Sequence, residues 1–475
     1  MSATLLDREA SALASAHDIA GAVVRGDTTA RAVVETALHR IATLNPVVNA
    51  FTDVTAERAL QAADAVDRRR AAGSPLGALA GFPFAAKNLF DIRGLPTRAG
   101  SKINRELPPA GSDAFLVAQL EKEGAILVGG LNMGEYACDF TGENAHDGPS
   151  RNPHGTDHMT GGSSGGSGAA VAAGLVPLAL GSDTNGSIRV PSSLCGTFGL
   201  KPTYGRLSRG GSFPFVSAFD HLGPFGRSVA DLALSYDVMQ GHDPADPMQS
   251  LRQPAATLPE LDQGIAGLRI AVAGGYFRRQ GQPEAFAAVD TVARALGATR
   301  MVALPQVEVA RAAAIVITSA EGAALHARRL RGRIEDFDPA VRTRLLGGLA
   351  TPAAWVEAAQ RFRRHFREQV LRLFDSVDVL LAPSTPCRAP RIGQKTMVLD
   401  GVTMPVRPNL GLYTQPISFI GLPVVAVPVL DGADLPIGVQ VIAPPWREDL
   451  ALRVARELER QGVVGCREAS LRSGA

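Results

Sequence analysis

Residues 160–191 read TGGSSGGSGAAVAAGLVPLALGSDTNGSIRVP, and no other stretch of the sequence says as much about local structure. Its glycine-serine run (161–168) leads into small apolar residues typical of a closely packed helix. The segment VPLALG (176–181) that follows has the pattern of a buried strand. A flexible linker is not normally followed by an apolar helix and a buried strand. We therefore expect ordered backbone here, which packs closely or takes unusual φ and ψ values.

The glycine-serine run can be compared with two known kinds of site, a phosphate-binding loop and a nucleophile elbow. It contains neither GxxxxGK[ST] nor GxGxxG, so a phosphate-cradling loop is excluded. It does match G-x-S-x-G over 162–166, the nucleophile elbow of α/β-hydrolases, which would make Ser164 the nucleophile. That mechanism also needs an acid and a histidine later in the chain. Histidines are available, but none lies in a segment that looks like a catalytic loop: His221, His242, His326 and His365.

A second candidate nucleophile follows the buried strand. The segment GSDTNGSIRVP (181–191) indicates a strand-to-helix turn, where successive backbone N–H groups can bind an anion. Ser187 lies at the start of the helix predicted over 187–194. A serine needs a neighbouring base to act as a nucleophile, whereas serine is common as a helix N-cap. Taken alone, this segment favours the N-cap.

A candidate base lies further upstream. Lys87 is one of only five lysines among 48 basic residues, and it occurs in GFPFAAKNLFD (81–91), an apolar run that predicts a strand over 82–90. Without other clues, a solvated lysine at a sheet edge is the simpler interpretation. If Lys87 is buried, its pKa falls below the usual value of about 10.4. A neutral lysine could then accept a proton.

The rest of the chain alternates helical and strand patterns around these motifs. We expect an α/β fold with a large mixed sheet, in one domain (1–475) made of N-terminal helices (1–71) and a catalytic core (72–475). The expected helices cover 3–26, 28–45, 112–124 and 447–462, with the second ending at Asn-Pro and the third capped by serine. The expected strands cover 125–128, 377–382, 422–429 and 437–442, and 268–304 has a β-α-β pattern.

Composition excludes several function classes. The net charge of +2 lacks the basic excess of a nucleic-acid binder, and no apolar run reaches the roughly 18 to 20 residues of a membrane helix. The N-terminus lacks a basic-then-apolar signal layout. The four cysteines are far apart and form no metal or disulfide pattern: Cys138, Cys195, Cys387 and Cys466. We expect a cytoplasmic protein without a metal.

Together the motifs resemble the amidase signature family. The resemblance rests on the ordered segments 81–101, 161–174, 181–209, 220–228, 421–429 and 435–443. It implies a large mixed central β-sheet covered by helices on both faces, and a Ser-Ser-Lys triad that needs no cofactor. Carried over by motif, Lys87 is the base, Ser163 is the bridging serine after a cis peptide, and Ser187 is the nucleophile. This assignment replaces Ser164. The N–H groups of the turn formed by Thr184, Asn185, Gly186 and Ser187 would hold the oxyanion.

Departures from the common family pattern indicate a branch. The turn reads DTNGS instead of DTGGS, and we expect Asn185 to accept a left-handed conformation. The segments NMGEYA (132–137) and RPNLGLYTQPISFIGLP (407–423) look similar to the biuret / 1-carboxybiuret hydrolase branch. At position 411, amidotransferase A subunits carry an Asp that holds the amino group of glutamine, whereas this chain has Gly411. Glutamine is therefore a poor candidate substrate.

Several hypotheses follow from the resemblance. The first is an amidohydrolase that releases ammonia from a small linear amide of the biuret or 1-carboxybiuret type. The alternatives are the glutaminase (A) subunit of a glutamyl-tRNA(Gln) amidotransferase, and a broad-specificity amidase, which the aromatic content of 5% supports poorly. The resemblance also implies a dimer of the large subunit together with a small helical partner subunit. Arg344, in VRTRL (341–345), resembles an arginine of amidotransferase A subunits that binds a substrate carboxylate.

Overall fold

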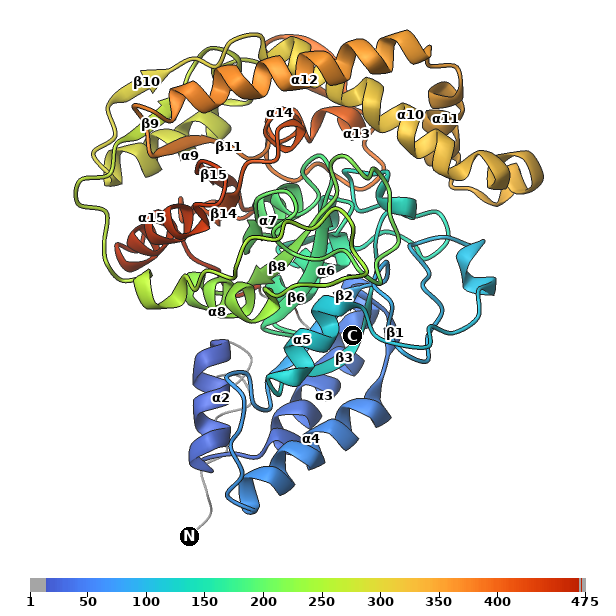
Figure 1. Cartoon of the computed structure of the whole chain (residues 1–475), viewed down its shortest axis with the longest axis vertical. Coiled ribbons are helices and arrows are strands. Elements are labelled where there is room, and N and C mark those ends of the chain that lie inside the picture. The colour runs from blue at the N-terminus through green and yellow to red at the C-terminus, as the bar shows by residue number, and fades with distance from the viewer. Residues whose placement is uncertain (1–13, 470, 472–475) are drawn as a thin grey trace.

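The computed structural model describes residues 14–469 and 471, and most of its described strands build one large sheet (Figure 1). Eleven strands lie in the order β1-β3-β2-β6-β8-β7-β14-β15-β11-β9-β10. Their bounds are β1 Phe51–Val54, β2 Pro83–Lys87, β3 Ile126–Leu131, β6 Leu178–Asp183, β7 Phe198–Lys201, β8 His221–Gly226, β9 Ile270–Ala273, β10 Arg300–Val302, β11 Val379–Pro383, β14 Val424–Pro428 and β15 Gly438–Ile442. Two short hairpins pair β4 Arg151–Asn152 with β5 Gly155–Met159, and β12 Thr396–Leu399 with β13 Val402–Pro405.

The sheet is mixed, as the sequence predicts. Strands β3, β2 and β6 pair in parallel toward one end, and β11, β9 and β10 do so at the other, while the strands between them are antiparallel. Every residue of β2, β6 and β14 is buried, so the sheet is covered on both faces. The expected fold class is confirmed.

Helices supply that cover. Their bounds are α2 Ala16–Arg25, α3 Ala30–Val48, α4 Ala56–Ala71, α5 Phe115–Lys122, α6 Gly165–Ala172, α7 Arg189–Cys195, α8 Val229–Met239, α9 Pro283–Ala295, α10 Val307–Arg333, α11 Pro339–Leu349, α12 Ala353–Leu373, α13 Val406–Asn409, α14 Gln415–Phe419 and α15 Glu448–Arg460. Long helices α10 and α12 pack against each other at one end of the molecule (Figure 1). None of the helices described here combines the length and apolarity needed to cross a membrane.

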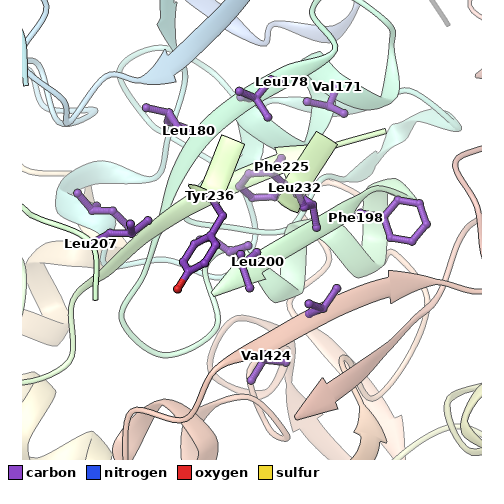
Figure 2. Close-up of a cluster of buried hydrophobic side chains, with 14 of the residues drawn as sticks. Val171, Leu178, Leu180, Phe198, Leu200, Leu207, Phe225, Leu232, Tyr236 and Val424 are labelled. Carbon is purple, nitrogen blue, oxygen red and sulfur yellow. The ribbon is translucent and has the colours of Figure 1, made fainter. Parts of the chain in front are cut away.

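The core beside the site is made by strands and helices far apart in the sequence. Figure 2 shows Leu178 and Leu180 of β6 in one cluster with Phe198 and Leu200 of β7 and Tyr236 of α8. These side chains are at most 1% exposed. Burying a large apolar side chain contributes roughly 1.5 to 3 kcal/mol, so this cluster fixes β6 firmly. Strand β6 therefore offers a rigid support for the turn that follows it.

Most predicted elements are confirmed, with shifted ends. The β-α-β pattern is present as β9, α9 and β10, with β9 and β10 parallel. The strands predicted over 377–382, 422–429 and 437–442 correspond to β11, β14 and β15. The helix predicted over 3–26 is observed only as α2, which begins at Ala16 after an N-cap at Ser15, and residues 3–13 lie outside the described residues.

Two predicted helix ends are wrong. The second helix does not stop at Asn45-Pro46 but continues as α3 to Val48 and ends at Asn49 in a left-handed conformation. Pro46 lies in the last turn, and it and Ala42 are exposed, so water can replace the hydrogen bond that proline cannot donate. Helix α5 begins at Phe115 rather than at the predicted Ser112 cap, because the Asp113 carboxylate accepts hydrogen bonds from Arg58 and from the Arg93 backbone.

Candidate active site

The candidate site lies where two neighbouring parallel strands end. Lys87 is the last residue of β2, and β6 ends at Asp183 directly before the turn 184–187. Because β2 and β6 pair in parallel, their carboxyl ends meet at the same edge of the sheet. Residues 87 and 184–187, which are about a hundred positions apart in the sequence, are brought together in this way.

Lys87 is completely buried and surrounded by serine hydroxyls. Its Nζ donates to the Oγ atoms of Ser163 at 2.7 Å, Ser182 at 2.8 Å and Ser164 at 3.0 Å. The lysine itself is 0% exposed, so the interpretation as a solvated edge lysine is wrong. Three hydroxyls can accept from the three donors of an ammonium and can also turn to donate to a neutral amine.

Burial also changes the acidity of Lys87. Desolvation lowers the pKa of its amine to about 7, while the negative charges of Asp220, Asp183 and Asp139 oppose that shift. A lysine with this pKa is neutral in a large fraction of molecules near pH 7 to 8. A large fraction of the molecules therefore carries a neutral amine that can accept a proton at neutral pH, which a general base requires.

The two adjacent serines differ in their surroundings. The peptide bond between Gly162 and Ser163 is cis, and Ser163 is fully buried beside Lys87. The Ser164 hydroxyl accepts from Lys87 and from the Ser182 backbone N–H, and it donates to the Ser182 carbonyl at 3.1 Å. Ser164 thus ties α6 to β6. None of the described histidines hydrogen-bonds to Ser164, as the elbow mechanism would require.

Ser187 is free of the capping role that the sequence allows. Helix α7 begins at Arg189, and the carboxylate of Asp183 accepts from the backbone N–H of Ile188 at 3.2 Å. This acceptor leaves the Ser187 side chain without a capping bond. Within residues 14–469 the Ser187 hydroxyl makes no hydrogen bond, and the residue is 2% exposed.

The turn before α7 presents unused donors. Among the described residues, the backbone N–H groups of Asn185, Gly186 and Ser187 donate to no acceptor. Gly186 has a φ of +142°, and a Cβ there would lie 2.1 Å from Oγ1 of Thr414. Both facts require glycine at 186. The expected left-handed conformation of Asn185 is wrong, because glycine takes the positive φ at the next position.

Hydrogen bonds to three other segments hold the turn in place. Thr184 donates to Asp220 at 2.6 Å, and the Asn185 amide donates to Thr318 of α10 at 3.0 Å. The Asn185 carbonyl accepts from Thr414 at 2.7 Å. The other atom of the Asn185 amide, Oδ1, is buried without a partner in the part of the chain that the structure describes. That oxygen is an acceptor available to a ligand N–H.

A buried ion pair joins the two residues that flank the turn region, Asp183 at the end of β6 and Arg189 at the start of α7. Arg189 and Asp183 are both 0% exposed, with Nε and Oδ2 3.0 Å apart. Arg189 lowers the pKa of the Asp183 carboxyl well below its usual range despite the burial. The guanidinium also donates to the Thr414 carbonyl, to Gln440 and to Ser418. Because both charged groups have hydrogen-bond partners, the ion pair can hold the turn in place without leaving a buried charge uncompensated.

Arg344 shares no hydrogen bond with Lys87, Ser163 or Ser187 in the part of the chain that the structure describes. It lies on α11, is half-buried, and makes no ion pair or hydrogen bond with the described residues. Its positive charge acts on Cys138, where it opposes the increase in the pKa of the thiol that burial causes. Helix α11 is held to the same segment, because the backbone N–H of Asp338 donates to Glu135 at 2.7 Å.

Sequence reasoning missed the third hydroxyl at Lys87. Ser182 lies in β6, next to Asp183, and is 4% exposed. A serine inside an otherwise buried strand, directly before the candidate turn, is the signal that could have found it. Among the described residues, no cluster of three or more His, Cys, Asp or Glu side chains could hold a metal ion.

Comparison with known proteins identifies the family. The amidase family model matches residues 32–452. The chain belongs to the amidase family. An enzyme of this family is a hydrolase that acts on amides. Lys87, Ser163 and Ser187 all lie inside the matched region.

Individual amidases resemble this chain over nearly its whole length. The AtzE chain of the 1-carboxybiuret hydrolase of Pseudomonas sp. (strain ADP) is 55% identical over 449 residues, which are 94% of this chain and 98% of that protein. The A chain of the glutamyl-tRNA(Gln) amidotransferase of Chromohalobacter salexigens is 38% identical over 93% of this chain and 95% of that one.

A solved structure is equally similar. It is the inhibitor-bound form of a vestigial protein complex that reveals the evolutionary origins of an s-triazine catabolic enzyme. Its chain is 54% identical to this amidase with a TM-score of 0.94, and the match covers 96% of this chain and 100% of that one.

Proposed function

We propose that this amidase hydrolyses a small linear amide of the 1-carboxybiuret type and releases ammonia. The observation that carries the proposal is the 55% identity to a 1-carboxybiuret hydrolase chain over nearly the full length of both proteins. The identity to amidotransferase A subunits is lower, at 36% to 40%. The amidotransferase role is therefore the second candidate.

Each member of the proposed triad has a defined role. Ser187 Oγ attacks the amide carbonyl, and its proton passes by way of Ser163 to the neutral amine of Lys87. The lysine ammonium then returns a proton through Ser163 to the departing nitrogen, which leaves as ammonia. Water, activated by the same pair, releases the acid from Ser187. The contact of 2.7 Å between Lys87 and Ser163, and the low pKa of the lysine, support this assignment.

The turn would stabilise the oxyanion formed by this attack. The unused N–H groups of Asn185, Gly186 and Ser187, with Thr184 at the head of the turn, are the donors that we propose. Each donor of this kind typically contributes roughly 3 kcal/mol to the transition state. Biuret-type substrates carry several N–H groups, and the unpaired Oδ1 of Asn185 offers them an acceptor.

The surroundings of Gly411 argue against glutamine as the substrate. A Cβ at this position would lie 2.4 to 2.8 Å from ring carbons of Phe140. The ring of Phe140 therefore fills the space that an aspartate side chain at 411 would need. The group expected to hold the amino end of glutamine is absent, and its space is taken.

A substrate panel tests the proposed function. Ammonia release should be measured with 1-carboxybiuret, biuret, glutamine and an aryl amide at equal concentrations. We expect 1-carboxybiuret to give the highest kcat/KM and glutamine to give no turnover above background. A higher kcat/KM for glutamine would establish the amidotransferase role instead, and similar values for all four would indicate a broad-specificity amidase.

Activity should depend on pH through Lys87. Only the neutral amine accepts a proton, so activity should rise as pH increases through about 7, the pKa of the buried lysine. At pH 6 the neutral fraction, and with it kcat/KM, should be about one tenth of the alkaline plateau. Initial rates on neutral biuret, whose charge does not change in this range, provide the measurement. A profile flat from pH 5 to 9 would contradict a lysine base.

We further propose that Arg344 binds the carboxylate of the substrate. The guanidinium has no partner among the described residues, and a planar guanidinium can pair with a carboxylate through two hydrogen bonds. Arg344→Lys should then increase KM for 1-carboxybiuret about tenfold or more and hardly change it for biuret. Arg342→Lys is the control on the same helix, since Arg342 pairs with Glu335. Equal losses on both substrates, or none on either, would remove Arg344 from the site.

We also propose that the chain associates with a small helical partner subunit, in a dimer of such pairs. The relative AtzE is named as a subunit, and the similar solved structure is of a protein complex. Co-purification with the product of an adjacent small reading frame, followed by mass measurement in solution, tests both parts. Purification of the chain without a second polypeptide, at the mass of a monomer, would contradict both parts of the proposal.

A further inference from the structure

A recess lined by arginines lies outside the candidate active site. Its volume is about 500 Å³, in the range of small-molecule sites. Helix α12 forms one wall, and the facing wall comes from residues 203–204, 420–421 and Trp446. None of the triad residues lines it. The lining side chains of α12 are Glu357, Gln360, Arg361, Arg363, Arg364 and Arg367.

Three of these arginines have no charged partner in the part of the chain that the structure describes. Arg361, Arg364 and Arg367 are exposed, and within the described residues none makes an ion pair or a hydrogen bond. Many other arginines of the chain are paired; for example, Arg58 contacts Asp113 and Glu121, each at 2.8 Å. Residues 361, 364 and 367 lie three apart on the helix and so share one side of it, within reach of a single ligand.

The fourth arginine belongs to the floor of the recess. Arg363 donates to the carbonyls of Phe419 at 2.6 Å and Ala218 at 2.8 Å, and its guanidinium lies 4.7 Å from the ring centre of Phe219. Burial lowers the pKa of Arg363, and the positive charge of Arg367 lowers it further. Tyr204 and the carboxylate of Glu321 oppose this shift, and an anion bound beside the two guanidinium groups would reduce their mutual repulsion further.

We propose that this recess binds a small polyanion with phosphoryl or carboxylate groups. The three exposed guanidinium groups offer paired N–H donors, which match the oxygens of either group. The volume of the recess suits a molecule the size of a small metabolite, and its lining also includes Gly421 and the half-buried Trp446. Glu357 is the one acid in the lining and repels an anion, so it limits the affinity.

Calorimetric titration of the protein, purified with any subunit that accompanies it, tests this site. Inorganic pyrophosphate and citrate serve as the two probes, and the tighter of them shows which anionic group the recess prefers. We expect saturable one-to-one binding and a loss of at least tenfold in Arg364→Ala/Arg367→Ala. Glu357→Gln should bind several-fold more tightly, because it removes a repelling charge.

The matched control is Arg372→Ala, an exposed arginine of the same helix that does not line the recess. It should bind both probes as the unchanged protein does. Absence of saturable binding by either probe would overturn the proposal. So would an equal loss in Arg372→Ala, or unchanged binding in the double variant, because each would show that the anion does not bind in this recess.

Discussion

Ser187→Ala should abolish amide hydrolysis while the protein stays folded. The Ser187 hydroxyl makes no hydrogen bond with the described residues, so its removal leaves no polar group without a partner. The loss of a nucleophile that forms a covalent intermediate commonly lowers kcat by roughly 10⁴-fold or more. Ammonia release from 1-carboxybiuret measures the activity, and a thermal melt within about 2 °C of the unchanged protein shows the retained fold.

A covalent probe makes this prediction specific to one serine. A fluorophosphonate should label Ser187, and labelling should be lost in Ser187→Ala but kept in Ser164→Ala. The Ser164 hydroxyl joins Lys87 to the backbone of β6, so Ser164→Ala should be less stable and less active without being inert. Labelling that is lost in Ser164→Ala and kept in Ser187→Ala would restore the α/β-hydrolase interpretation.

Lys87→Arg should be as inactive as Lys87→Ala, even though it keeps the positive charge. Arginine does not lose its proton in proteins, so it cannot accept the proton that leaves Ser187 by way of Ser163. Lys87 is also 0% exposed and surrounded by three hydroxyls, which leaves no space for a larger guanidinium. We expect kcat/KM on biuret to fall about a thousandfold or more in both variants.

Lys87→Met is the control for folding. It fills a similar volume without a charge and removes the cost of burying an amine, so it should fold at least as stably as Lys87→Arg. Comparison of the thermal melts then separates loss of the base from loss of structure. Activity of Lys87→Arg within tenfold of the unchanged protein would mean that Lys87 serves as a fixed charge and not as a base.

Local sequence patterns predicted the supporting elements well, because burial and turn chemistry are local properties. The apolar runs 82–90 and 176–181 predicted the existence of β2 and β6, although the strands end at Lys87 and Asp183 rather than at the ends of those runs. The pattern could not decide between Ser187 as cap and Ser187 as nucleophile, since the answer depends on the Asp183 carboxylate, which satisfies the start of α7. Once the structure shows that acceptor, the capping interpretation no longer holds.

Contacts between distant segments were beyond sequence reasoning. The sequence shows that Gly411 has no side chain, but it does not show that the ring of Phe140 fills the space beside it. In the same way, three serines surround Lys87 from positions 76 to 95 residues away, and the sequence motifs did not indicate that Ser182 would be one of them. The roles of the triad and of Arg344 stay predictions, which the variants above test.

The buried arginine behind the turn has a consequence for how the enzyme is made in the cell. Arg189 reaches acceptors at Thr414, Ser418 and Gln440, which are 225 to 251 residues later in the chain. On the ribosome, the segment around Ser187 emerges long before these acceptors exist. The guanidinium has its full set of partners only after residue 440 has been synthesised. A nascent chain or a truncated product that lacks these residues therefore carries Ser187 on a turn without its full support, and we expect hydrolysis to begin only after residue 440 has been added.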